Sequence, residues 1–256
     1  MNQLKSNIVK KKLKDNEITF GSWITIGHPI VAEVMTNAGF EWLTVDMEHS
    51  AITLDIAQDL ISIISLSGCV PFVRVPENNP VIIKRVMDAG AFGVIVPMVN
   101  DRKDAEKAVN AVRYPPFGFR GVGLARAQKY GFGLDEYKEW LENESMIIVQ
   151  IEHVHAVDNI DEILSVDGVD GFIVGPYDIS GSLGIPGNFD AKEFKDLIKK
   201  IIASSKENKK PAGIHVIPPD DKEVKRYIDM GYRFIAISLD TILLGSKCTD
   251  ILSRMR

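Results

Sequence analysis

The sequence predicts an α/β protein of the (β/α)8 TIM-barrel class, in which eight parallel strands close into a barrel with helices outside. Two observations predict this class. Eight short runs of mainly aliphatic and β-branched residues alternate with longer amphipathic segments along 256 residues, which is the usual size of such a barrel. Most of the runs are almost continuously apolar, as expected of strands that are buried on both faces. We expect residues 1–256 to form one domain.

The expected strands follow one another along the whole chain. They comprise residues 19–26, 42–47, 71–75, 93–98, 146–152, 171–175, 212–216 and 234–239. An open, doubly wound sheet is the main alternative, and it would carry a glycine-rich phosphate turn after its first strand. Gly27-His28-Pro29 follows the first run instead, so the closed barrel is favoured.

Helix signals fall between these strands, and helices are expected over residues 81–89, 101–112, 191–208 and 221–230. Asn79-Pro80 places a capping residue before a proline at the first helical position. Gly39, Gly90 and Gly231 follow expected helix ends, where glycine can adopt the left-handed conformation. The basic N-terminal stretch is expected to be an additional helical segment, which either caps the bottom of the barrel or stays loose.

The composition excludes several classes of protein. With 30 basic and 35 acidic residues the formal net charge is −5, and 45% of the residues are hydrophobic, as in ordinary globular domains. No apolar stretch approaches the roughly 20 residues of a membrane span, and the N-terminus lacks the apolar region of a signal peptide. Cys69 and Cys248 are too few for a disulfide framework. We therefore expect a cytoplasmic protein that binds neither nucleic acid nor membrane.

Charged and amide side chains stand at the C-terminal ends of four expected strands. His49 follows the second strand, Arg74 ends the third, Gln150 and Glu152 end the fifth, and Asp178 follows the sixth. Taken singly, each carboxylate has a structural alternative as a helix-start or turn residue. Active sites of this barrel lie at the C-terminal ends of the strands. We therefore expect these five side chains around one mouth.

These residue types indicate metal-assisted chemistry on a 2-oxo acid. Two carboxylates without cysteine favour Mg²⁺ or Mn²⁺, with Co²⁺ and Zn²⁺ as alternatives. Such a cation can stabilise an enolate, Arg74 adds a second positive charge, and His49 is a natural proton carrier. A Schiff-base mechanism would need a lysine on a strand, and none of the eight runs contains one. Phosphate binding is disfavoured by the two prolines and two acids that follow the seventh strand.

The same residues lie in segments that resemble the HpcH/HpaI family of class II, metal-dependent 2-oxo acid aldolases. Members of this family act on 4-hydroxy-2-oxo-heptanedioate and 2-dehydro-3-deoxyglucarate. The resemblance extends from about residue 20 to the C-terminus. It is carried by residues 39–49, 73–74, 79–90, 96–99, 113–123, 149–152 and 166–180.

The resemblance implies a role for each of the five side chains. Glu152 and Asp178 match the two metal ligands, and Gln150 matches an amide beside the metal. Arg74 matches the arginine that binds the keto oxygen and stabilises the enolate. His49 matches the general base, which acts through water.

The resemblance also implies a substrate-binding turn and a shared residue. Gly175, Tyr177 and Asp178 match the turn whose backbone N–H groups hold the pyruvate carboxylate. Asp88 matches an aspartate that pairs with the catalytic histidine. The helix after the third strand descends from the mouth, so Asp88 should lie near the bottom of its own barrel, away from His49. The pairing then has to come from a neighbouring subunit, in line with the hexamers described for this family.

The leading interpretation is an aldehyde-lyase that cleaves a 4-hydroxy-2-oxo acid to pyruvate and an aldehyde. Oxaloacetate decarboxylation and cleavage of a CoA ester would use the same enolate chemistry, and a non-catalytic barrel that binds 2-oxo acids is a third alternative. The chain departs from the family at Met47 and at Ser50-Ala51-Ile52. His153, His155 and His215 have no assigned role. The aldehyde partner therefore stays open.

Overall fold

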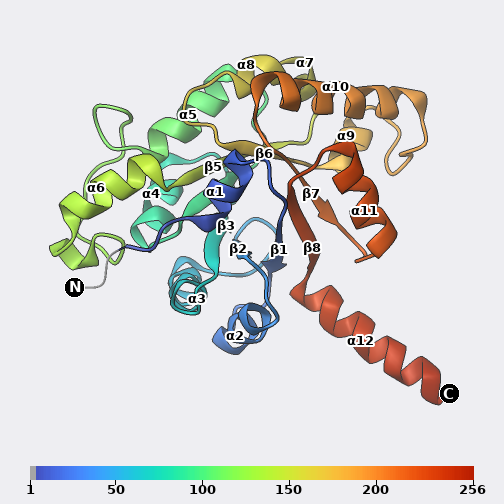
Figure 1. Cartoon of the computed structure of the whole chain (residues 1–256), viewed down its shortest axis with the longest axis horizontal. Helices are drawn as coiled ribbons and strands as arrows, with labels where there is room; N and C mark the ends of the chain where they lie inside the picture. Colours follow the sequence, from blue (N-terminus) through green and yellow to red (C-terminus); the bar gives the residue numbers. More distant parts are fainter. Residues whose placement is uncertain (1–3) are drawn as a thin grey trace.

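The computed structural model describes residues 4–256, which form the expected closed barrel (Figure 1). Eight strands follow one another in chain order, every neighbouring pair is parallel, and β1 closes the barrel against β8. The strands are β1 (Thr19–Ile24), β2 (Trp42–Asp46), β3 (Val70–Arg74), β4 (Gly93–Val96), β5 (Met146–Ile151), β6 (Gly171–Val174), β7 (Ala212–Val216) and β8 (Phe234–Leu239). All eight predicted strands are confirmed, with small differences at some ends.

Helices connect the strands along the outside of the barrel. They are α2 (Pro29–Asn37), α3 (Leu54–Leu66), α4 (Pro80–Asp88), α5 (Arg102–Val112), α6 (Leu134–Asn143), α7 (Val154–Asp158), α8 (Ile160–Leu164), α9 (Pro176–Ser182), α10 (Lys192–Asn208) and α11 (Asp221–Met230). A 3-10 turn, η1 (Lys129–Gly131), precedes α6. The predicted cap of α4 is confirmed, because the Asn79 side chain accepts hydrogen bonds from the N–H groups of Val81 and Ile82.

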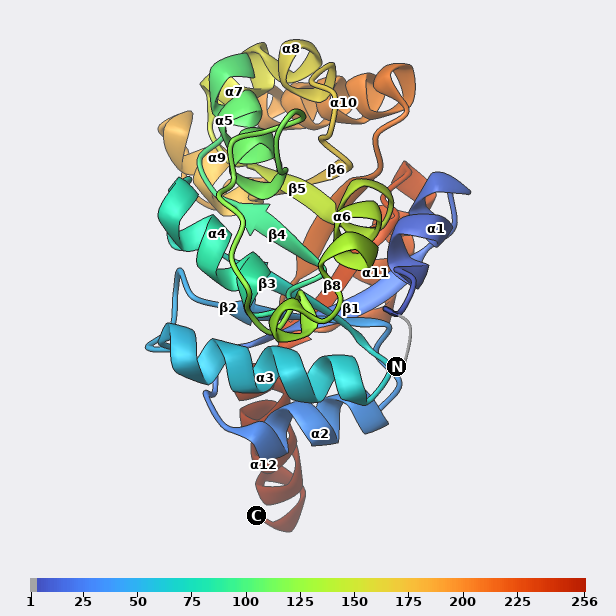
Figure 2. The same cartoon turned by 90° about the vertical axis from the view of Figure 1, so that its left-hand side faces the viewer.

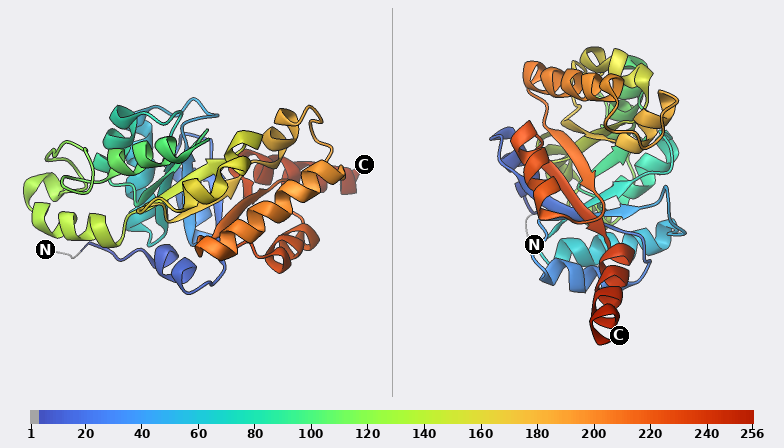
Figure 3. Two further views of the ribbon diagram at one scale, coloured as in Figure 1. Left: turned by 90° about the horizontal axis from the view of Figure 1, so that it is seen from above. Right: turned by 90° about the vertical axis from the view of Figure 1, so that its right-hand side faces the viewer.

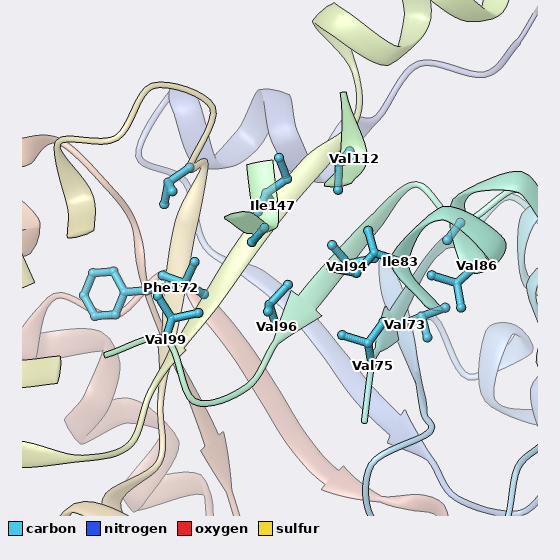
Figure 4. Close-up of a cluster of buried hydrophobic side chains, with 14 of the residues drawn as sticks. Val73, Val75, Ile83, Val86, Val94, Val96, Val99, Val112, Ile147 and Phe172 are labelled. Carbon is cyan, nitrogen blue, oxygen red and sulfur yellow. The ribbon is translucent and has the colours of Figure 1, made fainter. Parts of the chain in front are cut away.

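The largest apolar cluster lies between the strands and the outer helices. Figure 4 shows part of it, where Val73, Val94 and Val96 of β3 and β4 face Ile83 and Val86 of α4. All five side chains are completely buried. Each such side chain contributes about 1.5–3 kcal/mol to stability by its removal from water, so this layer fixes the helices against the barrel.

The lower interior of the barrel is filled by aromatic rings and closed by the N-terminal helix. The rings of Trp42 and Phe234 stack with their centroids 3.9 Å apart, and Phe72 meets both edge-on. Beneath them, α1 (Ile8–Lys14) contributes Val9 and Leu13 to the same cluster. The N-terminal segment is therefore a helix that caps the bottom of the barrel, the first of the two arrangements considered.

The last helix, α12 (Asp240–Met255), leaves the barrel instead of packing against it. It projects away from the other elements in Figures 1 and 2 and in the right panel of Figure 3. Asp240 is its only buried residue, whereas Leu244, Leu252 and Met255 are exposed. The sequence pattern did not predict this arrangement. Within residues 4–256, no helix is both long and apolar enough to span a membrane.

Candidate active site

A cavity of about 650 Å³ opens at the C-terminal ends of the strands. Its floor is formed by one side chain from each of four alternate strands, which is how the interior layers of such barrels are built. These side chains are Trp23 of β1, Arg74 of β3, Gln150 of β5 and His215 of β7. A second cavity of about 430 Å³, between α4 and α5, contains none of the predicted site residues.

Arg74 is held in one orientation by its neighbours. Its Nε and Nη2 atoms donate to the two carboxylate oxygens of Asp46 at 2.9 and 2.6 Å, and its guanidinium carbon lies 4.3 Å from the centre of the Trp23 ring. Such a two-point pair fixes the plane of the guanidinium. Its Nη1 atom has no hydrogen-bond partner in the part of the chain that the structure describes, so Nη1 is left for a ligand.

Two acids, Asp46 and Glu48, lie beside this arginine, and their pKa values shift in opposite directions. Burial alone would raise the pKa of Asp46, but the hydrogen bonds and charge of Arg74 outweigh it and lower that pKa. Burial raises the pKa of Glu48, helped by the negative charge of Glu152, although Arg74 acts in the opposite direction. Glu48 Oε2 lies 3.2 Å from Arg74 Nε and 3.7 Å from His49 Nε2. Glu48 therefore links the arginine to the histidine.

Glu152 and Asp178 converge at the turn that follows β6. Glu152 is buried, with Oε1 accepting from the Met98 N–H at 2.6 Å and Oε2 accepting from the Gln150 amide. A Cβ atom placed on Gly175 would lie 3.2 Å from Asp178 Oδ2 and 3.5 Å from Glu152 Oε2. The two carboxylates thus approach one small space, which only a glycine at position 175 leaves open.

This carboxylate pair fits a hard divalent cation. Oxygen donors suit Mg²⁺ and Mn²⁺, which usually take one or two carboxylates and complete their coordination with water and substrate. Across residues 4–256, no group of three or more His, Cys, Asp or Glu side chains is arranged to hold a metal ion. If a cation binds here, Glu152 and Asp178 are the residues that would hold it, and the remaining positions would be left to water and substrate.

The rim of the mouth carries His49 and the start of α9. The His49 side chain follows β2 at the same end of the barrel and is 68% exposed, but His49 is not among the residues that line the cavity. Helix α9 begins with Pro176, and the N–H groups of its first turn, at Tyr177 and Asp178, have no acceptor within the helix. Both groups belong to residues that line the cavity.

Asp88 lies at the other end of the molecule from His49, as its position in the sequence predicts. Helix α4 begins beside the mouth and ends with Asp88 shortly before β4 starts. The Asp88 carboxylate accepts from Arg120 at 2.5 Å and from Gln128 at 3.3 Å. Arg120 is 2% exposed. Asp88 therefore anchors the segment between α5 and α6, a role that the sequence did not reveal.

The three histidines without an assigned role, His153, His155 and His215, differ in position. His153 and His155 are outside the cavity, and His153 Nδ1 accepts from the His155 N–H to cap α7. His215 lines the cavity floor, with its ring centroid 5.3 Å from that of Trp23. Of these three histidines, only His215 lines the cavity.

Sequence reasoning missed Trp23, Asp46 and Glu48 as parts of this site. The signal for Asp46 is its register, because Asp46 and Arg74 are directly paired on neighbouring strands. Opposite charges placed side by side attract each other across a sheet. Register between distant segments follows from the folded barrel and is hard to read from one sequence.

Known proteins are similar to this chain in both sequence and fold. The sequence pattern of the HpcH/HpaI aldolase/citrate lyase family matches residues 19–246. A hydroxypyruvate/pyruvate aldolase of Roseobacter denitrificans is 38% identical over 251 residues, which cover 98% of this chain and 97% of that protein. A 5-keto-4-deoxy-D-glucarate aldolase of Enterobacter sp. is 39% identical over 242 residues, 93% of each chain. The crystal structure of an HpcH/HpaI aldolase/citrate lyase family protein from Burkholderia cenocepacia superimposes with a TM-score of 0.91 at 31% identity, covering 98% of this chain and 100% of that one.

Proposed function

The chain belongs to the HpcH/HpaI aldolase/citrate lyase family, and from this premise we propose that it is a divalent-metal-dependent aldolase. It cleaves a 4-hydroxy-2-oxo acid reversibly to pyruvate and an aldehyde. The observation that carries the proposal is the approach of Glu152 and Asp178 to one point at Gly175, on the wall of a cavity whose floor holds Arg74. The two relatives named above are aldolases by name, and their similarity to this chain covers nearly their full length. We propose that the whole chain works as one catalytic domain.

Glu152 and Asp178 would hold the cation, with Mg²⁺ or Mn²⁺ as the best fit to oxygen donors and Co²⁺ or Zn²⁺ as alternatives. When bound, the cation supplies a Lewis acid for the keto oxygen of the substrate. Gln150 and the Met98 N–H hold Glu152 in place through their hydrogen bonds. Ligands fixed in this way need little reorganisation when a substrate binds.

Arg74 binds the keto oxygen and stabilises the enolate that forms when the substrate is cleaved. Its Nη1 atom is available, because Asp46 occupies the other side of the guanidinium. A positive charge that is already oriented stabilises a developing negative charge without further rearrangement. The substrate carboxylate is held at the turn of Gly175, Tyr177 and Asp178, by the free backbone N–H groups at the start of α9.

His49 takes the proton of the C4 hydroxyl, directly or through a water molecule. The C4–O bond then becomes the carbonyl of the departing aldehyde, and the electrons of the broken C3–C4 bond form the pyruvate enolate. A proton added to C3 completes pyruvate. Since Asp88 of the same chain lies far from His49, the Asp88 that orients His49 comes from a neighbouring subunit.

A homo-oligomer of this chain, a hexamer by its family resemblance, would also cover surfaces that one chain leaves open. A groove of about 320 Å³ lies on the outside of β1 and β8, lined by apolar side chains such as Phe20, Ile228 and Ile237. This is where the eighth helix of such a barrel normally packs. The chain's own α12 leaves this position with its apolar side chains exposed. We propose that α12 of a second copy fills the groove.

The alternative activities have less support. Oxaloacetate decarboxylation would use the same enolate, and CoA-ester cleavage would need a basic groove for the nucleotide, whereas Asp220 and Glu223 line this cavity along with Arg226. A non-catalytic barrel that only binds 2-oxo acids would have no need of His49 as a proton carrier. The cytoplasm is the setting that we propose, because Cys69 and Cys248 are both free thiols.

The direct test is the release of pyruvate from several 4-hydroxy-2-oxo acids, and the reverse addition of pyruvate to a panel of aldehydes. The enzyme is assayed with Mg²⁺ or Mn²⁺ and again after exhaustive treatment with EDTA. We expect activity to disappear on chelation and to return with the metal. Full activity after chelation would contradict metal dependence, and faster turnover of oxaloacetate than of every hydroxy acid would favour the decarboxylase.

A further inference from the structure

The cavity at the mouth continues beyond the barrel floor, into the layer between the strands and two outer helices. His215 of β7 points into the floor, so Val216, the next residue of that strand, points to the outer face. Both residues line the cavity. Helices α10 and α11 flank β7, because α10 leads into that strand and α11 follows it. We call this outer part the side hollow, which is lined by Phe194, Ile198, Val216, Tyr227, Met230 and Tyr232.

Helix α11 packs less tightly against the barrel than α4 does. None of its residues Asp221–Met230 is buried, whereas α4 buries three. The reason is that α11 has open space on two sides. Tyr227 and Met230 line the side hollow, and Ile228 lines the groove outside β1 and β8 where α12 of a second copy is proposed to pack. The side hollow opens into the active-site cavity instead, so a ligand of that site can reach it.

The side hollow is open at the mouth and closed at its inner end. Tyr177, beside the mouth, is exposed, whereas Phe194 is buried and Tyr232 completely buried. Tyr232 stands four residues before Ala236, which pairs with His215 on the neighbouring strand. Four residues of a strand span about 13 Å, so the Tyr232 backbone lies well below the floor. A chain that enters from the active site can therefore extend along β7 and ends against Tyr232.

The charges that line the cavity leave no free cation for a second carboxylate. Arg74 is paired with Asp46 and faces the keto oxygen in the proposed mechanism. Arg226 of α11 pairs with Glu223 at 3.1 Å. Burial lowers the pKa of His215 to about 4, which keeps that ring neutral near pH 7. Within residues 4–256, no other basic side chain lines the cavity.

Apolar walls and the lack of free positive charge favour an uncharged, apolar occupant. A carboxylate in the side hollow would lose its hydration without gaining a partner, and Asp220 and Glu223 beside the hollow would repel it. Each methylene group that leaves water for apolar walls improves binding about fourfold. The side hollow therefore selects for chain length and against charge.

We propose that the side hollow binds the carbon chain beyond C4 of the substrate, so that this enzyme cleaves and forms 4-hydroxy-2-oxo acids whose chain is uncharged and apolar. This inference rests on the proposed aldolase function. With the substrate carboxylate at the turn of Gly175 and the keto oxygen on Arg74, the chain leaves over His215 into the side hollow. In the addition, C3 of pyruvate loses one proton and bonds to the aldehyde carbon, and the aldehyde oxygen gains a proton. No other reactant is consumed.

The test measures kcat/KM for a series of aldehydes, with pyruvate as the nucleophile and the metal-loaded enzyme. Propanal, butanal, pentanal and hexanal differ by one methylene each, and we expect kcat/KM to rise about fourfold at each step. The aldehyde 4-oxobutanoate has nearly the length of pentanal but ends in a carboxylate. Its kcat/KM should be at least about tenfold lower than that of pentanal, because the carboxylate finds no partner in the side hollow.

Substitutions that fill the side hollow locate the effect. In Ile198→Trp the larger ring occupies the space beside α10, so the ratio of kcat/KM for hexanal to that for propanal should fall at least about tenfold. Met230→Trp makes the same test from α11, where the side chain is only partly buried and a larger one is easier to accommodate. Ile202→Trp makes the same change one turn further along α10, outside the cavity, and should leave the ratio unchanged.

The outcomes separate the two proposals. A kcat/KM that does not rise from propanal to hexanal, or that is highest for 4-oxobutanoate, overturns the role of the side hollow and leaves the aldolase standing. An equal ratio in the wild type, Ile198→Trp and Met230→Trp also overturns it. If Ile198→Trp does not fold, Met230→Trp decides the question. Absence of metal-dependent turnover with every aldehyde of the series defeats the proposed function itself.

Discussion

The bottom and the mouth of the barrel interior are formed by one set of strands but have different roles. Near the bottom, β2, β3 and β8 direct Trp42, Phe72 and Phe234 inward, and the rings pack against one another. Two residues after Phe72, on the same face of β3, stands Arg74 at the mouth. Alternation along a strand sets which way a side chain points, and depth in the barrel decides whether it stabilises the fold or meets a ligand.

The largest effect should come from the mouth, in Glu152→Gln. Glutamine keeps an oxygen to accept from the Met98 N–H but removes the charge that binds the cation. We expect kcat/KM to fall by about 10³-fold, comparable to the loss of a strong electrostatic group at a reacting centre, while the unfolding free energy changes little. Steady-state kinetics and calorimetric titration with Mn²⁺ measure both effects. Unchanged metal affinity in this variant would remove Glu152 from the metal site.

The opposite pattern is expected at the bottom, in Trp42→Ala. The Trp42 ring is completely buried and stacked on Phe234, so its removal should cost about 3–5 kcal/mol of stability. The kcat/KM of the protein that stays folded should remain near the wild-type value. Urea unfolding together with kinetics at low temperature tests this, with exposed Leu66→Ala as the control. A loss of kcat/KM without a loss of stability would contradict the view that the bottom of the barrel stabilises the fold and only the mouth carries the activity.

Asp88 is expected to have an intermediate effect. It pairs with Arg120 in its own chain, and it is proposed to orient His49 in the active site of a neighbouring subunit. Asp88→Asn keeps an acceptor for Arg120 and removes the charge offered to His49. We expect kcat to fall about 100-fold, typical of impaired proton transfer, with the oligomer intact by gel filtration. Asp88→Ala also leaves the buried Arg120 unpaired and should be less stable. Full activity of either variant in an intact oligomer rules out the shared site.

The smallest effect is a pH dependence of stability that arises at the mouth. The pKa of His215 is about 4 in the folded protein, below the 6.5 expected for the unfolded chain. The unfolded chain therefore takes up the proton first as the pH falls. The contribution of the neutral ring is present above pH 6.5 and is lost progressively toward pH 4. Between pH 7 and pH 4.5 the wild type should lose about 2 kcal/mol more than His215→Leu in urea unfolding. Parallel curves for the two proteins would show that the ring titrates normally.

The strands and the placement of the proposed site were predictable because they follow from local pattern. Apolar runs mark strands that are buried on both faces, and a charge at the end of such a run must meet a partner or a ligand. Glu152 and Asp178 follow the neighbouring strands β5 and β6, so their approach to each other follows once the barrel is assumed. Their roles in binding metal stay predictions.

The parts that could not be predicted depend on contacts between distant segments. The hydrogen bonds between Asp46 and Arg74 depend on the register of β2 and β3. Glu152 is held by the backbone N–H of Met98. Every residue other than proline has such a group, so the sequence does not mark this one. The departure of α12 was missed because an amphipathic helix has the same pattern whether it packs on its own barrel or on another chain.

The closed bottom of the barrel sets an order of events. Because α1 and the aromatic rings seal one end, molecules enter and leave past the rim where His49 lies. In the proposed mechanism, a keto acid on the floor lies beneath an aldehyde held at the rim. We therefore propose that the keto acid enters before the aldehyde during synthesis, and that the aldehyde leaves before pyruvate during cleavage. In this proposal, a helix on the far side of the protein helps to set the order in which substrates bind and products leave.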